Sequence, residues 1–141
     1  MKADCMYCTE NETLQGKMEF ICNLGSSKVY LARNQRYPGR CILSCNQHYD
    51  ELFEMPLKER ELFMNDVSFV AKKLKELFSA DKINYGIYGD EVPHVHVHLA
   101  VKKRGGDNWG DAFALIGGEK TLPDDEFASM LEMIGNALSC A

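Results

Sequence analysis

The sequence predicts an α+β domain, in which an antiparallel sheet is covered on one face by one long helix. The helix is predicted over residues 56–79, because apolar side chains recur there at intervals of three and four residues. Strands are predicted from short apolar runs on both sides of this helix, separated by turns that contain glycine, proline or asparagine. The connections between these runs are short, which favours an antiparallel sheet.

Three strands are expected before the long helix. Residues 17–23 and 27–33 form the arms of a hairpin around the turn at residues 24–26. A second turn, marked by Pro38 and Gly39, leads into a strand over residues 40–45. The segment before the helix therefore supplies three of the expected strands.

Two further strands and a second helix are expected after the long helix. Residues 83–88 form the fourth strand, and a turn leads into a fifth strand over residues 94–101. A closing helix is predicted over residues 124–138, where acidic residues mark the first turn. No repeat, low-complexity segment or linker interrupts this order, so we expect a single domain over residues 1–141.

Charge and hydropathy limit the classes of function. The formal net charge is −5, which argues against a general binder of nucleic acids or membrane surfaces. No apolar run approaches the ~18 residues of a membrane span. The N-terminus lacks the basic and apolar regions of a secretory signal. We therefore predict a cytoplasmic protein with no nucleic-acid partner and no membrane partner.

Three of the four histidines occupy alternate positions of the fifth strand, at His94, His96 and His98. Successive side chains of a strand point to opposite faces, so these imidazoles share one face and the intervening valines take the other. Each imidazole has a donor and an acceptor that need partners, which makes such a row a poor core face. A solvated face is one interpretation; metal binding, catalysis, or a division of both among the histidines is favoured.

Cys5 and Cys8 form a C-x-x-C pair near the N-terminus. Two thiolates on a short turn can reach one ion, which is half of a tetrahedral zinc site. A redox pair is the alternative, although such a pair normally lies at a strand-to-helix junction and no strand is expected before Cys5. Cys45 and His48 have C-x-x-H spacing, so Cys45 is a rival zinc ligand. In the absence of a secretory signal, metal binding or reduced thiols are favoured over disulfides for the six cysteines.

The segment His-Val-His-Val-His-Leu-Ala at residues 94–100 resembles the motif of the histidine triad (HIT) family. The resemblance extends over almost the whole chain, because the C-x-x-C pair looks like that of zinc-carrying bacterial members and residues 89–93 are similar to the segment before the triad in a bacterial branch. It implies a HIT-like fold with a five-stranded antiparallel sheet. It also implies a homodimeric hydrolase or transferase that binds a purine nucleotide and attacks the α-phosphate of a phosphoramidate or a dinucleoside polyphosphate.

The resemblance implies a role for several residues. His96 matches the nucleophile, which forms a nucleotidyl-imidazole intermediate, and His98 matches the residue that contacts the phosphate and the leaving group. These two are the expected catalytic residues, since a neutral imidazole is a good nucleophile near neutral pH. Asn34 corresponds most nearly to the ribose-binding residue, Asn84 matches the bacterial branch, and Asp90 takes the place of an amide that often holds the phosphate. All five are expected to bind the nucleotide.

The ligands of zinc-carrying members match Cys5, Cys8, His48 and His94. This set implies a closed zinc site of two thiolates and two imidazoles, which is structural rather than catalytic. The first histidine of the triad would then serve the metal, and the other two would serve the chemistry.

Two positions depart from the family pattern and keep alternatives open. Arg40 stands where many members have a histidine, and Asp90 replaces an amide. A carboxylate beside a phosphate is unfavourable, so Asp90 favours a second hypothesis, a nucleotide-binding module with little or no turnover. A third hypothesis is a metalloenzyme with an open site on all three triad histidines and a redox C-x-x-C.

Overall fold

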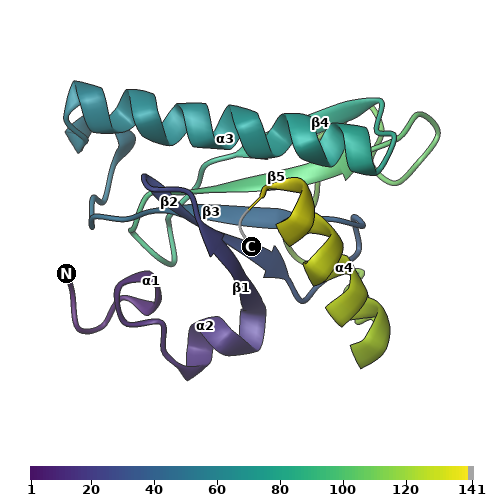
Figure 1. Cartoon of the computed structure of the whole chain (residues 1–141), viewed down its shortest axis with the longest axis horizontal. Helices are drawn as coiled ribbons and strands as arrows, with labels where there is room; N and C mark the ends of the chain where they lie inside the picture. Colours follow the sequence, from purple (N-terminus) through teal and green to yellow (C-terminus); the bar gives the residue numbers. More distant parts are fainter. Residues whose placement is uncertain (140–141) are drawn as a thin grey trace.

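Within residues 1–139, which the computed structural model describes, five antiparallel strands form a sheet in the order β1-β2-β3-β5-β4 (Figure 1). The predicted α+β class is therefore confirmed. The strands are β1 (Met18–Asn23), β2 (Ser27–Ala32), β3 (Cys41–Cys45), β4 (Lys82–Gly86) and β5 (His96–Lys102). The helices are α1 (Met6–Thr9), α2 (Glu12–Lys17), the 3-10 turn η1 (Leu52–Glu54), α3 (Leu57–Leu77) and α4 (Asp124–Ala137).

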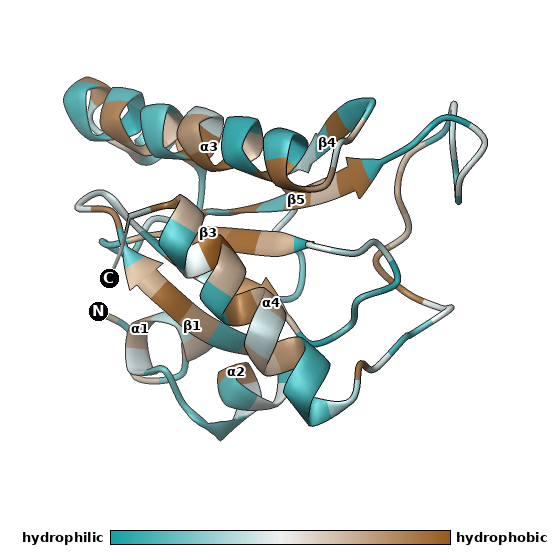
Figure 2. Ribbon diagram, turned by 45° about the vertical axis from the view of Figure 1, so that its right-hand side comes forward, coloured by the Kyte–Doolittle hydropathy of each residue, from teal (hydrophilic) through white to brown (hydrophobic). Residues whose placement is uncertain are grey.

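The long helix α3 and the closing helix α4 cover one face of the sheet. Alternate strand residues such as Val29, Leu31 and Leu43 point into this core, where they meet Leu74 of α3 and Ile134 of α4. Figure 2 shows brown apolar segments on β1, β3 and β5, and mixed hydropathy along α3. The helix periodicity read from the sequence thus places one stripe of α3 against the sheet.

The N-terminal helices α1 and α2 cover part of the opposite face. Tyr30 and Ile42, which alternate with the core residues of β2 and β3, are buried there against Tyr7 of α1 and Leu14 of α2. The C-x-x-C pair predicts only a short turn, so α1 and α2 are additions to the predicted fold. Asn11 caps α2 by accepting a hydrogen bond from the Leu14 backbone N–H at 3.2 Å.

The histidine strand begins later than expected. β5 starts at His96, because the backbone of Val95 bonds to the Tyr49 carbonyl and the Cys45 amide, while the His94 amide turns back to the Val92 carbonyl. His94 thus lies outside the ladder of β5, yet Val95 and Val97 both point into the core under α3, and Tyr7 packs against the rings of both His94 and His96. The difference from the prediction is therefore the residue at which the strand begins.

The remaining elements lie close to their predicted bounds. β4 ends at Gly86 rather than at residue 88, and α4 ends at Ala137. Cys22 is buried and disulfide-bonded, which corrects the expectation of reduced or metal-bound cysteines at that position. In the described part of the chain, none of the helices has both the length and the apolar composition that crossing a bilayer requires.

Candidate functional site

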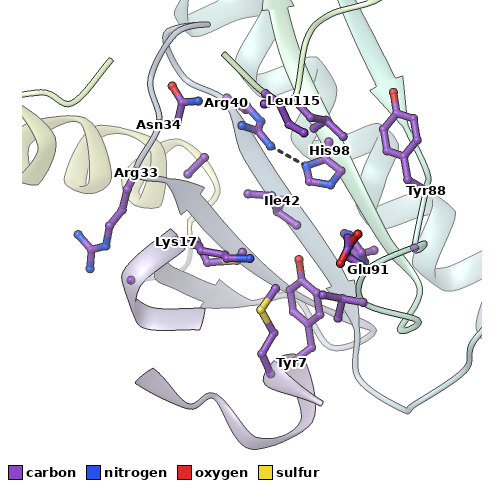
Figure 3. A pocket seen from close by; sticks show the side chains of 18 of the residues that line it. Tyr7, Lys17, Arg33, Asn34, Arg40, Ile42, Tyr88, Glu91, His98 and Leu115 are labelled. Carbon is purple, nitrogen blue, oxygen red and sulfur yellow. Dashed lines mark hydrogen bonds between the residues drawn. The ribbon is translucent and has the colours of Figure 1, made fainter. Parts of the chain in front are cut away.

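A cavity of about 680 Å³ opens on the sheet face that contains His96 and His98 (Figure 3). It lies between the N-terminal helices and the loop that leads to α4, and its size is typical of small-molecule sites. Its wall combines several apolar side chains with a few polar groups. The apolar lining residues are Met6, Tyr7, Met18, Ala32, Ile42, Val92, Leu115 and Ile116.

His96 presents a nitrogen lone pair to the cavity. Its Nδ1 lies 2.6 Å from the backbone carbonyl oxygen of His94, and a carbonyl only accepts, so Nδ1 holds the proton. The unprotonated Nε2 is therefore available to a ligand. Burial lowers the pKa of His96, which favours the neutral ring. This imidazole is suited to nucleophilic attack.

His98 presents the opposite group. Its Nδ1 lies 2.9 Å from Nη2 of Arg40, and a guanidinium only donates, so the proton of neutral His98 is on Nε2. Burial, and to a lesser extent the charge of Arg40, lowers the pKa of His98 to about 3. The ring centroids of His96 and His98 are 5.0 Å apart. The cavity therefore contains a lone pair and an N–H donor side by side.

Arg40 is a residue of this cavity that was not among the predicted site residues. It lies immediately before β3, lines the cavity, and is 8% exposed. The signal that could have identified it is its two-residue spacing from Ile42, which puts both side chains on the cavity face of the predicted strand.

The three other predicted nucleotide-binding residues lie in different places. Asn34 is on the cavity wall, and its Oδ1 accepts hydrogen bonds from the backbone N–H groups of Arg36 and Lys120. This arrangement leaves the Asn34 amide NH₂ as a donor. Asp90 lines the cavity but is exposed. Asn84 is not among the lining residues and pairs with Ala100 across β4 and β5.

The four predicted metal ligands converge beside this cavity. Their ligand atoms all lie within 4.8 Å of one another: Cys5 Sγ is 3.4 Å from His94 Nδ1, and Cys8 Sγ is 3.3 Å from His48 Nδ1. Ideal tetrahedral zinc geometry places such pairs of ligand atoms about 3.3–3.8 Å apart, given Zn–S and Zn–N bonds of about 2.3 and 2.0 Å. The cluster can therefore hold a metal ion.

The outer nitrogens of both imidazoles support this interpretation. His94 Nε2 lies 2.8 Å from the Cys45 carbonyl oxygen, and His48 Nε2 lies 2.8 Å from Asp50 Oδ1. Both partners are acceptors, so the Nε2 atoms hold the protons and the two Nδ1 lone pairs face each other at 3.1 Å. Facing lone pairs repel unless a cation lies between them, and such acceptors commonly orient metal-bound histidines.

The rival ligand sets do not form. Cys45 Sγ donates to the Gln47 carbonyl oxygen at 2.9 Å and lies outside the cluster. The Nδ1 atoms of the triad histidines have three separate partners, so these rings do not converge on one ion. Among residues 1–139, the group formed by Cys5, Cys8, His48 and His94 is the candidate metal site.

Tyr7 connects the two sites. It lies inside the C-x-x-C pair, and its ring centroid is 5.3 Å from that of His94 and 4.8 Å from that of His96. It also lines the cavity, where Figure 3 shows its hydroxyl pointing toward the ligand space. Tyr7 was not among the predicted site residues, although its place between two expected metal ligands is the signal that could have indicated a role.

Comparisons with known proteins agree with this geometry. A sequence model of the HIT domain matches residues 15–105. A histidine triad protein from Sinorhizobium meliloti is 26% identical, with 90% of this chain and 94% of that one covered and a TM-score of 0.82. One from Marinobacter aquaeolei is 22% identical, with coverages of 93% and 96% and a TM-score of 0.83.

A zinc-bound histidine triad family protein from Mycobacterium smegmatis has a similar fold, at 18% identity, coverages of 96% and 94% and a TM-score of 0.68. No curated protein matches the chain.

Proposed function

The chain belongs to the HIT family, and from this premise we propose that it is a nucleotide hydrolase or transferase that cleaves at the α-phosphate of a nucleoside phosphoramidate or a dinucleoside polyphosphate. The family implies the general class, a nucleotide-binding hydrolase or transferase. The observation that supports the finer proposal is the pair of imidazoles with opposite protonation at the cavity floor.

In the proposed reaction, Nε2 of His96 attacks the α-phosphorus. A P–N bond forms to the imidazole as the bond to the leaving group breaks, and His98 contacts the phosphate through Nε2–H and helps to pass a proton to the leaving group. Water then cleaves the phosphoramidate bond and releases the nucleotide. Placed donors of this kind stabilise the charge that develops on phosphoryl oxygens.

The cavity wall supports a purine nucleoside as the bound part of the substrate. Apolar side chains such as Met6 and Ile42 line the cavity and can pack against a base. Asn34 would donate its free amide to a ribose hydroxyl, because its oxygen already has two backbone partners. Asp90 would contact the ligand at the rim, whereas the predicted role of Asn84 lacks support from the cavity lining.

We further propose that Cys5, Cys8, His48 and His94 bind a structural zinc ion. The chemistry and spacing of the donor set support zinc, and the histidine triad family protein from Mycobacterium smegmatis is zinc-bound. When bound, the ion would fix the N-terminal segment to His94, two residues before β5 begins. His94 would then hold its carbonyl in place for His96 Nδ1–H.

The proposal includes a single HIT domain over residues 1–141 that works as a homodimer in the cytoplasm. Two features support self-association: β4 is at the edge of the sheet, and Tyr85 and Ile87 expose 56% and 42% of their surface there. Exposed apolar side chains along a sheet edge are typical of protein interfaces.

A nucleotide-binding module with little or no turnover is the second candidate. It is favoured by the carboxylates that line the cavity, Asp90, Glu91 and Glu119, because negative charge disfavours a second anion at the phosphate.

Intact-protein mass spectrometry after brief incubation with an adenosine phosphoramidate separates the two candidates. We expect an increase of one AMP unit in wild type, persistence of this adduct in His98→Ala, and its absence in His96→Ala. Turnover should fall by about 10⁴-fold or more in His96→Ala, as for other nucleophiles. Unchanged turnover in that variant would contradict the enzyme, and AMP binding without any adduct would favour the binding module.

A further inference from the structure

Arg40 is a buried cation that lacks a counter-ion in the described part of the chain. The residue is 8% exposed, and the hydrogen bond of its side chain within residues 1–139 runs from Nη2 to His98 Nδ1. Nε is shielded from solvent and has no partner among residues 1–139. A guanidinium has five N–H donors, so most of its hydrogen-bonding capacity is unused.

The surroundings of Arg40 do not neutralise its charge. Burial lowers its pKa, and the groups that act in the opposite direction are phenols and a thiol (Tyr7, Tyr37, Tyr88 and Cys41), with no carboxylate among them. An arginine stays protonated in proteins, so the charge is retained in the wall of the cavity. A buried charge without a partner is costly, and such costs are often offset by a ligand.

Two neighbouring arginines show the contrast. Arg33 lies 2.6 Å from Glu19 and Arg36 lies 2.6 Å from Asp107, both measured from a guanidinium nitrogen to a carboxylate oxygen. Arg33 also lines the cavity, but Figure 3 shows its guanidinium pointing away from His98. Arg40, by comparison, is directed at the imidazole pair.

We propose that Arg40 is the anion-binding residue of this cavity, which holds a phosphate oxygen of the ligand and thereby selects phosphorylated nucleosides over unphosphorylated ones. Guanidinium groups bind phosphate strongly through parallel N–H donors. The contact between Arg40 and His98 places that phosphate beside the two imidazoles. The nucleoside part of this inference rests on the proposed function, whereas the anion-binding part does not.

A purely structural arginine would behave differently. Removal of a structural residue destabilises the protein, whereas removal of an unpaired buried charge leaves the free protein at least as stable. The proposal therefore predicts that removal of Arg40 lowers the affinity for a phosphorylated ligand without lowering the stability of the free protein.

The test is isothermal titration of AMP, adenosine and pyrophosphate into wild type, Arg40→Gln and Arg33→Gln, with thermal unfolding of each free protein. We expect wild type to bind AMP more tightly than adenosine. Arg40→Gln should lose about 10- to 100-fold in AMP affinity, with adenosine affinity and melting temperature undiminished. Arg33→Gln removes the same charge from the cavity wall and should keep the wild-type ratio of AMP to adenosine affinity.

The other outcomes separate the two proposals. An Arg40→Gln variant that keeps the wild-type ratio, or loses both affinities together with stability, would overturn the role of Arg40. Equal binding of AMP and adenosine by wild type would overturn it as well, while leaving nucleoside binding in place. Arg40-dependent binding of pyrophosphate alone would support Arg40 and contradict the nucleotide function, and no binding of any probe would contradict both.

Discussion

The candidate metal cluster and the cavity beside it both use histidines from residues 94–98, but the two sites differ in what each imidazole faces. At His94 the Nδ1 atom points at three other ligand atoms, and Nε2 is fixed by a backbone carbonyl. At His96 and His98 only Nδ1 has a hydrogen-bond partner among residues 1–139, so Nε2 is available to a ligand. The difference teaches that the partner of the second ring nitrogen decides whether a histidine of this motif is structural or reactive.

The largest expected effect follows from removal of one of the four proposed zinc ligands. Cys5→Ser should reduce bound zinc from about one ion per chain to near zero, measured by elemental mass spectrometry. The free energy of unfolding should fall by about 3 kcal/mol or more, because metal binding is coupled to folding.

Two variants sharpen this test. Cys45→Ser should keep the metal, because Cys45 Sγ bonds to the Gln47 carbonyl outside the cluster. His96→Ala should also keep the metal while it loses the AMP adduct. Full metal occupancy in Cys5→Ser would show that the ligand set is wrong.

The second effect concerns the protonation of the cavity. The pKa of His98 is lowered from 6.5 to about 3 in the folded chain, so below pH 6.5 the unfolded chain binds a proton that the folded chain does not. The stability that neutral His98 provides is fully present above pH 6.5 and is lost as the pH falls toward 3. Urea unfolding at a series of pH values measures how the free energy of unfolding depends on pH. Between pH 3 and 6.5 this free energy should rise less steeply with pH in His98→Gln than in wild type, by up to about 1.4 kcal/mol per pH unit.

Asn34→Ala is the matched control for this pH dependence, since it alters the same cavity without removing a titratable group. It should keep the wild-type slope. An unchanged slope in His98→Gln would mean that this ring is protonated to the same extent in both states.

The smallest expected effect concerns the hydrogen bond between His48 Nε2 and Asp50. Asp50→Asn weakens the acceptor that lies 2.8 Å from His48 Nε2. Zinc affinity should fall by about 10-fold, as is typical when the partner of a metal-bound histidine is changed, with AMP affinity unchanged. A competition titration with a chelator measures the first quantity, and an unchanged zinc affinity would separate Asp50 from the metal site.

Much of the fold could be predicted from local patterns. The periodicity over residues 56–79 predicts α3 (Leu57–Leu77), and the acidic first turn predicts α4 (Asp124–Ala137). The short helices α1 and α2 were not predicted, because segments of four and six residues show too little periodicity. Their apolar residues are recognisable only once Tyr30 and Ile42 offer a second buried face.

The residue types of the candidate site could be predicted, but several contacts between its residues could not. The triad and the C-x-x-C pair were evident in the chain, and the four ligands implied by family resemblance do converge. Arg40 was noticed only as a departure, because its contact with His98 joins residues 58 positions apart. The placement of Asn84 outside the cavity depends equally on the order of the strands.

The sequence by itself determined the five strands and the two longer helices, the alternation of His96 and His98, and the chemical character of both sites. These properties depend on the repeat of the strand and the helix and on side-chain chemistry, which are local. Only the tertiary structure decided that the ring of His94 meets Cys5, 89 residues away, and that Arg40 is buried with no counter-ion among residues 1–139. Such choices depend on long-range packing, which sets the partner of each ring nitrogen and guanidinium after the chain has folded.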